Sequence, residues 1–351
     1  MWLELQNVSR YFGTRKAVDG LSLSLEQGSI GCLLGPSGCG KTTALRCIAG
    51  FEPVTAGSIR AHGRVLVSPE FSTPPESRRI GMVFQDYALF PHLTAADNVA
   101  FGLHRLPAGD RTRRATEMLE AVGLADYRSH YPHQLSGGQQ QRIALARALA
   151  PEPELILLDE PFSSLDVELR ERLSVEVRGI LKALNATALL VTHDQQEAFA
   201  MADIIGVMKE GRLEQWDTPY QLYHRPGTRF VADFVGQGVF LSGRIIEHGS
   251  VQTEVGVMRI DGPIDSKGAW KTGDRVELLL RPDDVIHDDA STLRAEVCQR
   301  TFRGAEFLYT LRMPGGARLL SLVPSHHDHQ IGESIGIRIE PDHVVAFAVP
   351  R

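Results

Sequence analysis

The sequence has few cysteines, no long apolar run and no excess of positive charge, and each absence excludes a class of protein. Its four cysteines, Cys32, Cys39, Cys47 and Cys298, show no CxxC spacing, which indicates reduced thiols rather than disulfides or a zinc site. No apolar run approaches the roughly 20 residues that a membrane-spanning helix needs. The first residues, MWLELQNVSR, lack the apolar core of a signal peptide. Any link to a membrane is therefore expected to run through a partner protein.

The charge and composition narrow the choice further. A formal net charge of −6 disfavours a nucleic-acid binder, because phosphate contacts need a basic face. Hydrophobic residues make up 43% of the chain and charged residues 23%, which is typical of a globular protein and excludes a disordered or collagen-like chain. At 351 residues the chain exceeds one ordinary domain, so we expect two or three domains, each with its own core.

Residues 1–235 predict an α/β domain, because short apolar runs alternate there with helical stretches. Continuously apolar runs, typical of strands buried on both faces, are found at 30–34, 155–158 and 188–192. Helices that a glycine or a proline would end are expected at 115–122 and 139–150.

From about residue 236 the pattern changes, and residues 236–351 predict a second, all-β, barrel-like domain. Short β-like runs broken by Gly, Pro and Asp lie at 239–246, 275–280, 293–301, 307–312 and 334–340. In the last run Ile335, Ile337 and Ile339 alternate with other residues, as in a half-buried strand.

A phosphate-binding loop follows the apolar run at 30–34. Residues 35–42, Gly-Pro-Ser-Gly-Cys-Gly-Lys-Thr, fit GxxxxGK[ST] and precede a helical stretch that ends at Gly50. Backbone N–H groups of such a loop surround a triphosphate, while Lys41 reaches the β- and γ-phosphates and the Thr42 hydroxyl binds Mg²⁺. We therefore predict a nucleotide site that includes Gly35, Pro36, Ser37, Gly38, Cys39, Gly40, Lys41, Thr42 and Thr43.

Acidic residues and a histidine follow two of the apolar runs. Asp159 and Glu160 end the run at 155–158, where Asp159 would hold Mg²⁺ and Glu160 would polarise an attacking water. Alone, such a pair is explained equally well by a turn at a strand edge, but the phosphate-binding loop favours a hydrolytic site. His193 follows the run at 188–192, at a carboxyl end where ligands bind in open α/β sheets. A lone histidine also has a purely structural explanation.

A second glycine motif, Leu135-Ser136-Gly137-Gly138-Gln139, opens the expected helix at 139–150. The unpaired N–H groups of a helix start and the helix dipole favour an anion. A glycine N-cap without any ligand is the alternative for this pentapeptide by itself. Two phosphate clamps far apart in one chain indicate two subunits that face each other head to tail.

Five elements in this order resemble the nucleotide-binding subunits of ABC transporters. They are the phosphate-binding loop, Gln85 after a strand, the LSGGQ signature, the pair Asp159-Glu160, and His193. Residues 161–166, Pro-Phe-Ser-Ser-Leu-Asp, resemble the D-loop of that family, which lies across the dimer interface. The resemblance covers about two thirds of the chain.

The resemblance implies the fold and a role for each residue. The fold is an α/β P-loop NTPase with a helical subdomain at about 86–150, followed by a small OB-like regulatory domain. Phe12, rather than Tyr11, would stack on adenine. Lys41, His193 and Mg²⁺ would stabilise charge on the γ-phosphate of ATP while Glu160 activates water. Gln85 would join this catalytic set, and Thr42, Gln85 and Asp159 would bind the Mg²⁺. In a homodimer, the residues that complete each ATP site are Ser136, Gly137, Gly138, Gln139 and Asp166.

The resemblance also implies partners and a location. The family works at the cytoplasmic face of the bacterial inner membrane, bound to membrane-spanning permease subunits and indirectly to a periplasmic solute-binding protein, without nucleic acid. The aromatic-rich segment 86–93, DYALFPHL, is expected to form the groove that receives a short helix of the permease. A core position for Tyr87, Leu89 and Phe90 is the alternative.

The most detailed prediction concerns the transported solute, or cargo. The YALFPHLT run, the QLSGGQQQR signature and the β-domain resemble the importers of maltose, polyamines, sulfate and ferric ion. The stretch 67–76 and the compact C-terminal region are most similar to ferric-ion importers, so ferric iron is the expected cargo, with sulfate, polyamine or sugar as alternatives. A soluble ABC ATPase acting on nucleic acid is disfavoured by the single cassette and by the absence of a heptad run. A metabolic P-loop NTPase does not explain LSGGQ.

Two local features stay open. His326, His327 and His329 have metal-ligand side chains, but adjacent residues rarely converge on one ion without partners elsewhere, so a solvated turn is the simpler explanation. Cys39 inside the phosphate-binding loop would be either a redox brake or an inert neutral thiol, and the latter is favoured.

Overall fold

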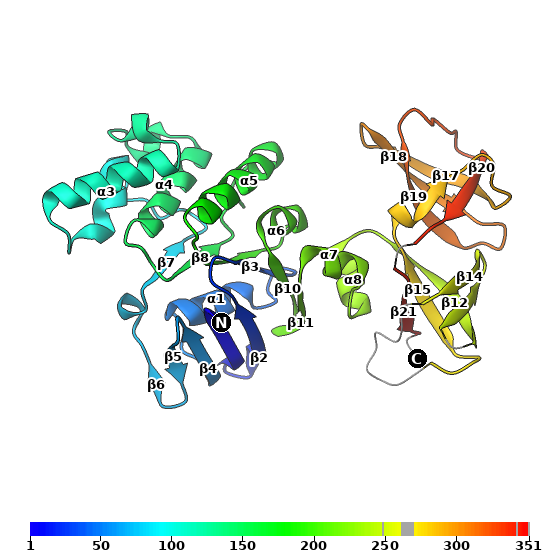
Figure 1. Ribbon diagram of the computed structural model, residues 1–351, viewed down its shortest axis with the longest axis horizontal. Helices are drawn as coiled ribbons and strands as arrows, with labels where there is room; N and C mark the ends of the chain where they lie inside the picture. Colours follow the sequence, from blue (N-terminus) through cyan, green and yellow to red (C-terminus); the bar gives the residue numbers. More distant parts are fainter. Residues whose placement is uncertain (248, 261–269, 342, 350–351) are drawn as a thin grey trace. The chain divides into compact units, whose positions relative to one another are not determined.

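The structure is a computed structural model. It describes residues 1–247, 249–260, 270–341 and 343–349. The chain divides into two compact units, Met1–Pro219 and Tyr220–Arg351 (Figure 1). Within the part of the chain described, no helix combines the length and the apolar character needed to cross a membrane.

A six-stranded sheet forms the centre of the first unit. Its strands are β3 (Ile30–Leu34), β7 (Ile80–Val83), β8 (Leu155–Asp159), β9 (Ala188–Thr192), β10 (Ile204–Lys209) and β11 (Arg212–Asp217). The order is β11-β10-β3-β9-β8-β7, with parallel pairing except between β10 and β11. Every residue of β3, β8 and β9 is buried, as predicted for strands covered on both faces. The predicted α/β class is confirmed.

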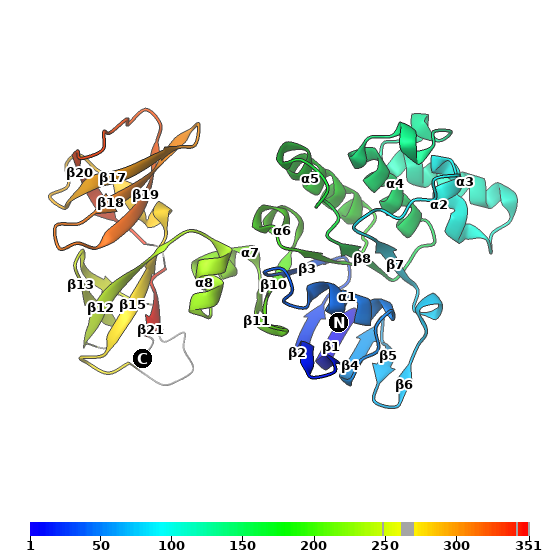
Figure 2. The same cartoon turned by 180° about the vertical axis from the view of Figure 1, so that it is seen from behind.

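Helices cover both faces of this sheet. They are α1 (Lys41–Ala49), α5 (Val167–Ala183) and α6 (Gln195–Met201). Figures 1 and 2 place α1 on one face, and α5 with α6 on the other. Leu45 and Ile48 of α1 share a core with Leu33, Leu157 and Leu189 of the strands. The loop between β3 and α1 is therefore anchored at both ends by buried elements.

An antiparallel sheet, which the sequence patterns did not predict, packs on the other side of α1 (Figure 2). Its strands are β1 (Leu3–Phe12), β2 (Arg15–Leu25), β4 (Ala56–Ala61), β5 (Arg64–Ser68) and β6 (Phe71–Ser72), in the order β2-β1-β4-β5-β6. Leu21, Leu23 and Leu25 alternate with exposed or half-buried serines, which is the period of a strand with one face in the core. The hairpin of β1 and β2 brings its turn to the start of α1.

A helical region joins β7 to β8. Its helices are α2 (Ala95–Ala100), α3 (Ala108–Ala121) and α4 (Gly137–Leu149), with 3₁₀ turns at Phe101–Leu103, Ala125–Tyr127 and Pro132–Gln134. A further 3₁₀ turn, Pro75–Ser77, precedes β7. α3 begins earlier than the predicted 115–122 because its arginine-rich first turns are largely exposed and carry no apolar period. α4 begins two residues before the predicted start, where the Ser136 hydroxyl accepts a hydrogen bond from the Gln139 N–H.

The second unit contains two short helices and then strands. The helices are α7 (Pro219–His224) and α8 (Arg229–Val235). The strands are β12 (Val239–Glu247), β13 (Ser250–Thr253), β14 (Gly256–Arg259), β15 (Arg275–Leu280), β16 (Val285–His287), β17 (Arg294–Phe302), β18 (Glu306–Arg312), β19 (Arg318–Pro324), β20 (Ser334–Ile339) and β21 (Val345–Ala348). The sheets β14-β13-β12-β15-β21 and β16-β20-β17-β18-β19 enclose one apolar core. The predicted all-β, OB-like domain is confirmed, and each predicted strand agrees with the structure to within one residue at either end.

A buried arginine explains why α7 and α8 fold with these sheets. Arg281 is 4% exposed, and its Nη1 donates to the carbonyl oxygens of Ala232 at 3.1 Å and Gly236 at 2.7 Å. The composition of the sequence changes at about residue 236, whereas the structure divides into its two units between Pro219 and Tyr220. The domain limits at 1–235 and 236–351 stay a prediction.

Candidate active site

The loop between β3 and α1 turns sharply because glycines occupy its strained positions. Gly38 has φ +80° and Gly40 has φ +107°, values that residues other than glycine rarely adopt. A Cβ atom on Gly40 would lie 2.1 Å from the carbonyl oxygen of Ala17 in β2. Only glycine therefore lets the chain pass β2 and enter the first turn of α1, where backbone N–H groups lack helical partners.

Lys41 places its charge inside this loop. The side chain is only 4% exposed, and Nζ donates to the carbonyl oxygens of Gly35 at 2.7 Å and Pro36 at 3.1 Å. The Sγ of Cys39 lies 3.8 Å from Nζ, and burial raises the pKa of the Cys39 thiol, which supports an inert neutral thiol. The loop therefore curves around a positive charge that neutral carbonyls hold, and a phosphate is a stronger acceptor for it.

One hollow of about 240 Å³ brings three distant segments together at this loop. It is lined by Phe12, Arg15, Ala17, Ser37, Gly38, Gly40, Lys41, Thr42, Thr43 and Glu160. Three other predicted loop residues, Gly35, Pro36 and Cys39, do not line the hollow. Gly35 and Cys39 are buried, whereas Pro36 is exposed. Glycine backbone, a lysine, two threonine hydroxyls and a carboxylate thus face one space.

Oxygen ligands converge beside this hollow. The Thr42 hydroxyl donates to Oδ1 of Asp159 at 3.0 Å. Burial raises the pKa of the Asp159 carboxyl, and the hydrogen bond from Thr42 opposes that shift. Gln85 and Asp159 both line an adjoining hollow of about 510 Å³ with Phe84, Asp86 and Arg46. Hydroxyl, carboxylate and amide oxygens are the ligands that Mg²⁺ prefers, so this donor set fits the ion.

Glu160 and His193 lie together at the carboxyl ends of β8 and β9. Nδ1 of His193 is 3.3 Å from Oε2 of Glu160. Glu160 has φ +44°, an uncommon conformation for a residue with a side chain. Its N–H donates to the Val191 carbonyl at 3.0 Å and its carbonyl accepts from the Ser163 hydroxyl at 3.0 Å, which hold that conformation. The strained backbone directs the carboxylate into the hollow lined by Phe12, Lys41 and Thr42, which we call the nucleotide hollow.

The hairpin of β1 and β2 supplies the aromatic wall of the hollow. Phe12 is 44% exposed and pairs across the hairpin with Arg15, which the sequence analysis missed. The signal was present, because Gly13 and Thr14 form a two-residue turn that places the two side chains opposite each other. Tyr11 does not line the hollow, which favours Phe12 as the stacking residue.

The signature residues lie elsewhere in the first unit. Ser136 caps α4, and its N–H donates a hydrogen bond to Oε1 of Gln139 at 2.8 Å. Gly137 lies so close to Leu165 that a Cβ atom there would be 3.0 Å from its Cδ2, and Asp166 caps α5. None of the residues 136–139 lines the nucleotide hollow. The two predicted phosphate clamps are not brought together within one chain.

The aromatic segment after Gln85 only partly matches its predicted role. Tyr87 is 7% exposed and its hydroxyl lies 2.7 Å from that of Ser164, which supports the alternative of a core position for this residue. The docking groove of the segment as a whole stays a prediction. Phe90 is half-buried against Phe101, with ring centroids 4.2 Å apart. Arg147 of α4, which sequence reasoning missed, donates to the carbonyls of Tyr87 at 2.8 Å and Ala88 at 2.6 Å.

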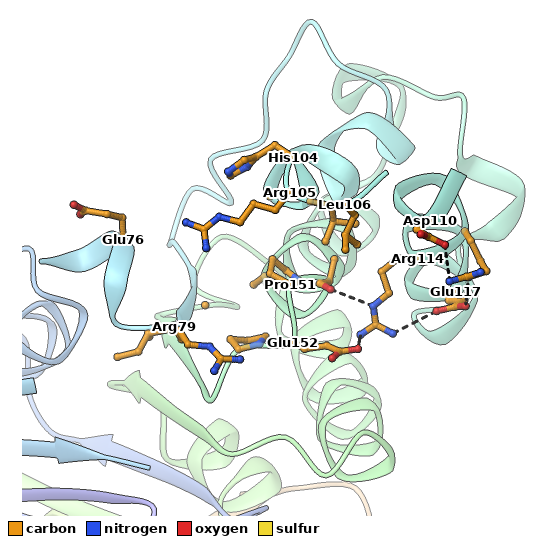
Figure 3. Close-up of a pocket in the computed structure, with 18 of the residues that line it drawn as sticks. Glu76, Arg79, His104, Arg105, Leu106, Asp110, Arg114, Glu117, Pro151 and Glu152 are labelled. Atoms are coloured by element: carbon orange, nitrogen blue, oxygen red, sulfur yellow. Dashed lines mark hydrogen bonds and ion pairs between the residues drawn. The ribbon is translucent and has the colours of Figure 1, made fainter. Parts of the chain in front are cut away.

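A larger hollow of about 920 Å³ lies between the helical region and the loops before β7 and β8 (Figure 3). Its wall carries charges of both signs, among them Arg79, Arg105, Asp110 and Glu117. Arg114 lies in this wall, where it donates to the Ala150 carbonyl and forms ion pairs with Glu117 and Glu152, as the dashed lines in Figure 3 show. The residues that line this hollow include none of the predicted catalytic residues.

A buried carboxyl group beneath the site was also missed. Glu197 of α6 is 4% exposed and accepts a hydrogen bond from the Thr192 hydroxyl at 2.8 Å. Burial raises the pKa of Glu197 to about 8. The only sequence signal was its position on the inner face of a short amphipathic helix. The sequence analysis missed Glu197 because an acidic residue in the first turn of a helix is ordinarily exposed.

Comparisons with known proteins agree with this geometry. Residues 18–163 match the family model described as ABC transporter, and residues 261–347 match the one described as TOBE domain. The chain is 39% identical to the spermidine/putrescine import ATP-binding protein of Oleidesulfovibrio alaskensis, with 96% of this chain and 93% of that protein covered. It is 44% identical to a sulfate/thiosulfate import ATP-binding protein of Chromobacterium violaceum, with 93% and 89% covered.

A solved structure is also similar. It is a dimeric ATP-binding cassette in a post-hydrolysis state with ADP and Pi, 32% identical to this chain, with a TM-score of 0.54. The match covers 62% of this chain and 98% of the cassette.

Proposed function

Since this chain belongs to the ATP-binding subunits of ABC importers, we propose that its hydrolysis of ATP drives the uptake of a polyamine of the spermidine and putrescine class. The observation that carries this cargo is the similarity over nearly the whole chain to the spermidine/putrescine import ATP-binding proteins of Oleidesulfovibrio alaskensis and of Rubrobacter xylanophilus, the latter 42% identical. Sulfate is the second candidate, because the Chromobacterium violaceum relative is 44% identical. The expected ferric-ion cargo has no support among these relatives.

We assign the steps of hydrolysis to the residues that meet in the nucleotide hollow. Phe12 stacks on adenine, and Lys41 with the loop N–H groups holds the β- and γ-phosphates. Glu160 accepts a proton from the attacking water as the oxygen approaches the γ-phosphorus and the bond to the β-phosphate oxygen breaks. When both of its ring nitrogens carry protons, His193 donates from Nδ1 to that carboxylate, 3.3 Å away, and from Nε2 toward the γ-phosphate.

Thr42, Asp159 and Gln85 would hold Mg²⁺, since their oxygens meet beside the hollow. The ion supplies positive charge that neutralises the phosphates. The 3.0 Å hydrogen bond between Thr42 and Asp159 keeps the two ligands adjacent before nucleotide binds.

The active unit in this proposal is a homodimer. Ser136, Gly137, Gly138 and Gln139 would reach the γ-phosphate of ATP held by the partner copy, with Asp166 at the interface. Support comes from the separation of residues 136–139 from the nucleotide hollow of their own chain and from the dimeric state of the similar cassette. The N-terminus of α4, capped by Ser136, offers N–H groups and a favourable dipole to that phosphate.

The homodimer in this proposal binds a membrane-spanning permease, which would place this chain at the cytoplasmic face of the inner membrane. A periplasmic solute-binding protein would act on the opposite side of that membrane. We place the permease contact at the hollow of Figure 3 rather than at Tyr87. Leu106, 42% exposed, offers an apolar contact there, and the surrounding charges of both signs suit a short amphipathic helix.

Uptake by cells tests the cargo. A strain of the source organism that lacks this chain would be complemented with the intact chain or with Glu160→Gln, and uptake of labelled putrescine, spermidine, sulfate and ferric iron would be measured in parallel. Selective loss of putrescine and spermidine uptake in the Glu160→Gln strain is expected. Normal polyamine uptake together with loss of sulfate uptake would contradict a polyamine cargo and favour sulfate, without changing the proposed ATPase role.

A surface variant tests the permease contact. Leu106→Glu would place a charge in the wall of the hollow in Figure 3 without touching the nucleotide residues. We expect uptake to fall severely while the ATPase rate of the purified chain is kept. Leu184→Glu, at a 40% exposed leucine of similar size after α5, is the matched control, and equal loss of uptake in both variants would contradict this docking surface.

A further inference from the structure

Three histidines from separate segments of the second unit meet at one point. His287 is the last residue of β16, and His327 and His329 follow the end of β19. One ring nitrogen from each of the three lies within 4.8 Å of those of the other two. The ring of the neighbouring His326 lies 4.3 Å from that of His327, tilted by 44°, but His326 is not part of this group. The sequence pattern HHDH therefore lacked a ligand that only the fold supplies.

The nitrogens are spaced as ligands of one ion. Nε2 of His329 lies 3.1 Å from Nε2 of His287. Two ligands of a tetrahedral zinc ion, each at about 2.0–2.1 Å from the metal, are separated by about 3.3 Å. Two ring nitrogens facing each other at this distance can share one proton, but an ion between them and His327 uses all three lone pairs.

The rest of the domain holds these rings in place. The buried Tyr309 hydroxyl donates to the His327 carbonyl at 2.8 Å and accepts from the His329 N–H at 3.0 Å. Arg300 pairs with Asp328 between them and donates to the His329 carbonyl at 3.1 Å. A loop with bonds on both sides of its two histidines is preorganised, which lowers the entropy cost of ligand binding.

Two carboxylates contact the histidine rings, one from Glu333 and one from Asp289. Oε1 of Glu333 lies 2.8 Å from Nδ1 of His329, so this ring's Nδ1 is engaged and its Nε2 is directed at His287. Asp289 places a carboxylate oxygen 3.2 Å from Nε2 of His287, on the exposed side of the group. The His287 and His329 side chains are only 7% and 15% exposed, respectively. The negative charge of the two carboxylates favours a bound cation here.

We propose that His287, His327 and His329 form a binding site for a divalent transition-metal ion, of the class that imidazole prefers: Zn²⁺, Ni²⁺ or Cu²⁺. Three histidines supply three positions of a tetrahedral site, and the exposed side next to Asp289 supplies the fourth. Mg²⁺ prefers oxygen ligands, so the site discriminates against the ion of the nucleotide hollow. The proposal does not depend on the cargo or on the ATPase cycle.

The test is a titration of the full, nucleotide-free chain with Zn²⁺ by calorimetry, and with Co²⁺ by absorption spectroscopy, which reports tetrahedral coordination. We expect one saturable site. His287→Ala and His329→Ala each weaken it at least about tenfold, and Glu333→Gln weakens it less than either. His326→Ala, the matched control one residue away from His327, leaves the affinity unchanged.

Circular dichroism and the midpoint of thermal unfolding confirm that each variant is folded, and His329→Gln replaces any alanine variant that is not. Equal affinity of the intact chain, His287→Ala and His329→Ala would overturn the proposal, because the measured ion would then be bound elsewhere. Equal loss in His326→Ala would also overturn it, since the adjacent histidines alone would then account for binding. The absence of any saturable binding of Zn²⁺ or Co²⁺ would refute the site outright.

Discussion

At the scale of single residues, Glu160 combines three properties of a catalytic group. Its backbone is strained at φ +44°, its carboxylate lines the hollow beside Lys41 and Thr42, and its partner is His193. Strain of this kind persists only where the surrounding structure holds it, and here a hydrogen bond to the Val191 carbonyl of β9 and one from the Ser163 hydroxyl do so. If Glu160 acts as the general base that we propose, it would accelerate hydrolysis by a factor on the order of 10²–10⁴.

Glu160→Gln is therefore expected to slow ATP hydrolysis by at least about 100-fold, since glutamine keeps the shape but cannot accept the proton. ATP-dependent dimerisation should survive, because the groups that bind phosphate are unchanged. Phosphate release and analytical ultracentrifugation with ATP measure the two effects, with the exposed Glu168→Gln as the control. A normal rate of hydrolysis would remove Glu160 from the mechanism.

Glu197 makes the stability of the first unit depend on pH. Burial raises its pKa from the ordinary 4.5 to about 8, so the folded chain keeps this proton over a range in which the unfolded chain loses it. The stabilisation is complete below about pH 4.5 and is lost as the pH rises through about 8.

Glu197→Gln should abolish that dependence. Between pH 5 and 8 the free energy of unfolding of the intact chain is expected to fall relative to that of the variant by a few kcal/mol, because about 1.4 kcal/mol accompanies each unit of pKa shift. Chemical denaturation at several pH values measures it. Glu120→Gln, at an exposed position of α3, is the control, and parallel pH profiles for the intact chain and Glu197→Gln would refute this assignment.

At the scale of elements, α4 connects two parts of the proposed mechanism. Its N-terminus carries the signature residues capped by Ser136. Further along, Arg147 donates to the carbonyls of Tyr87 and Ala88, which lie two and three residues after Gln85. Tyr87 and Ala88 have φ +60° and +46°, so the arginine holds a strained loop. Arg147 therefore links α4 directly to the segment that carries Gln85.

Arg147→Met is expected to loosen this loop, because two carbonyls lose a charged donor. We expect the free energy of unfolding to fall by about 1–3 kcal/mol and amide hydrogen exchange to rise in residues 85–90. Arg172→Met on α5, where the arginine is 66% exposed, is the matched control. Unchanged exchange in residues 85–90 would contradict the role given to Arg147.

At the scale of the whole molecule, one chain lacks a complete ATP site in the proposed mechanism. Ser136→Arg would block the signature and Lys41→Ala would empty the phosphate-binding loop, so each variant should be inactive by itself. Mixing them should restore one competent site in each mixed dimer, and about a quarter of the normal rate if the sites act independently.

The measurement is the ATPase rate of the two variants alone and mixed, with mixed dimers counted by tagged pull-down. Two copies of the same variant, one tagged and one not, provide the control. The absence of rescue where mixed dimers are abundant would contradict the head-to-tail arrangement.

The sequence by itself determined the catalytic motifs and the most buried strands. Residues 35–42 fit a phosphate-binding pattern that depends on the backbone of the loop itself, and β3, β8 and β9 are apolar at almost every position, so local order and burial suffice to identify them. The sequence also predicted β12, β15, β17, β18 and β20 of the second unit, and β20 carries a period-2 pattern that reflects local exposure. It did not predict β13, β14, β16, β19 or β21. The polar first half of α3 was not predicted either, since an exposed helix start carries no apolar period.

Only the tertiary structure decided which distant residues meet. Phe12 and Glu160 line one hollow because the hairpin of β1 and β2 packs over α1, and Tyr87 is buried because it reaches Ser164. His287 joins His327 and His329 only because β16 and the end of β19 lie in one sheet system. Such contacts depend on the packing of whole elements, which minimises exposed apolar surface over the entire chain and leaves no trace in any short segment.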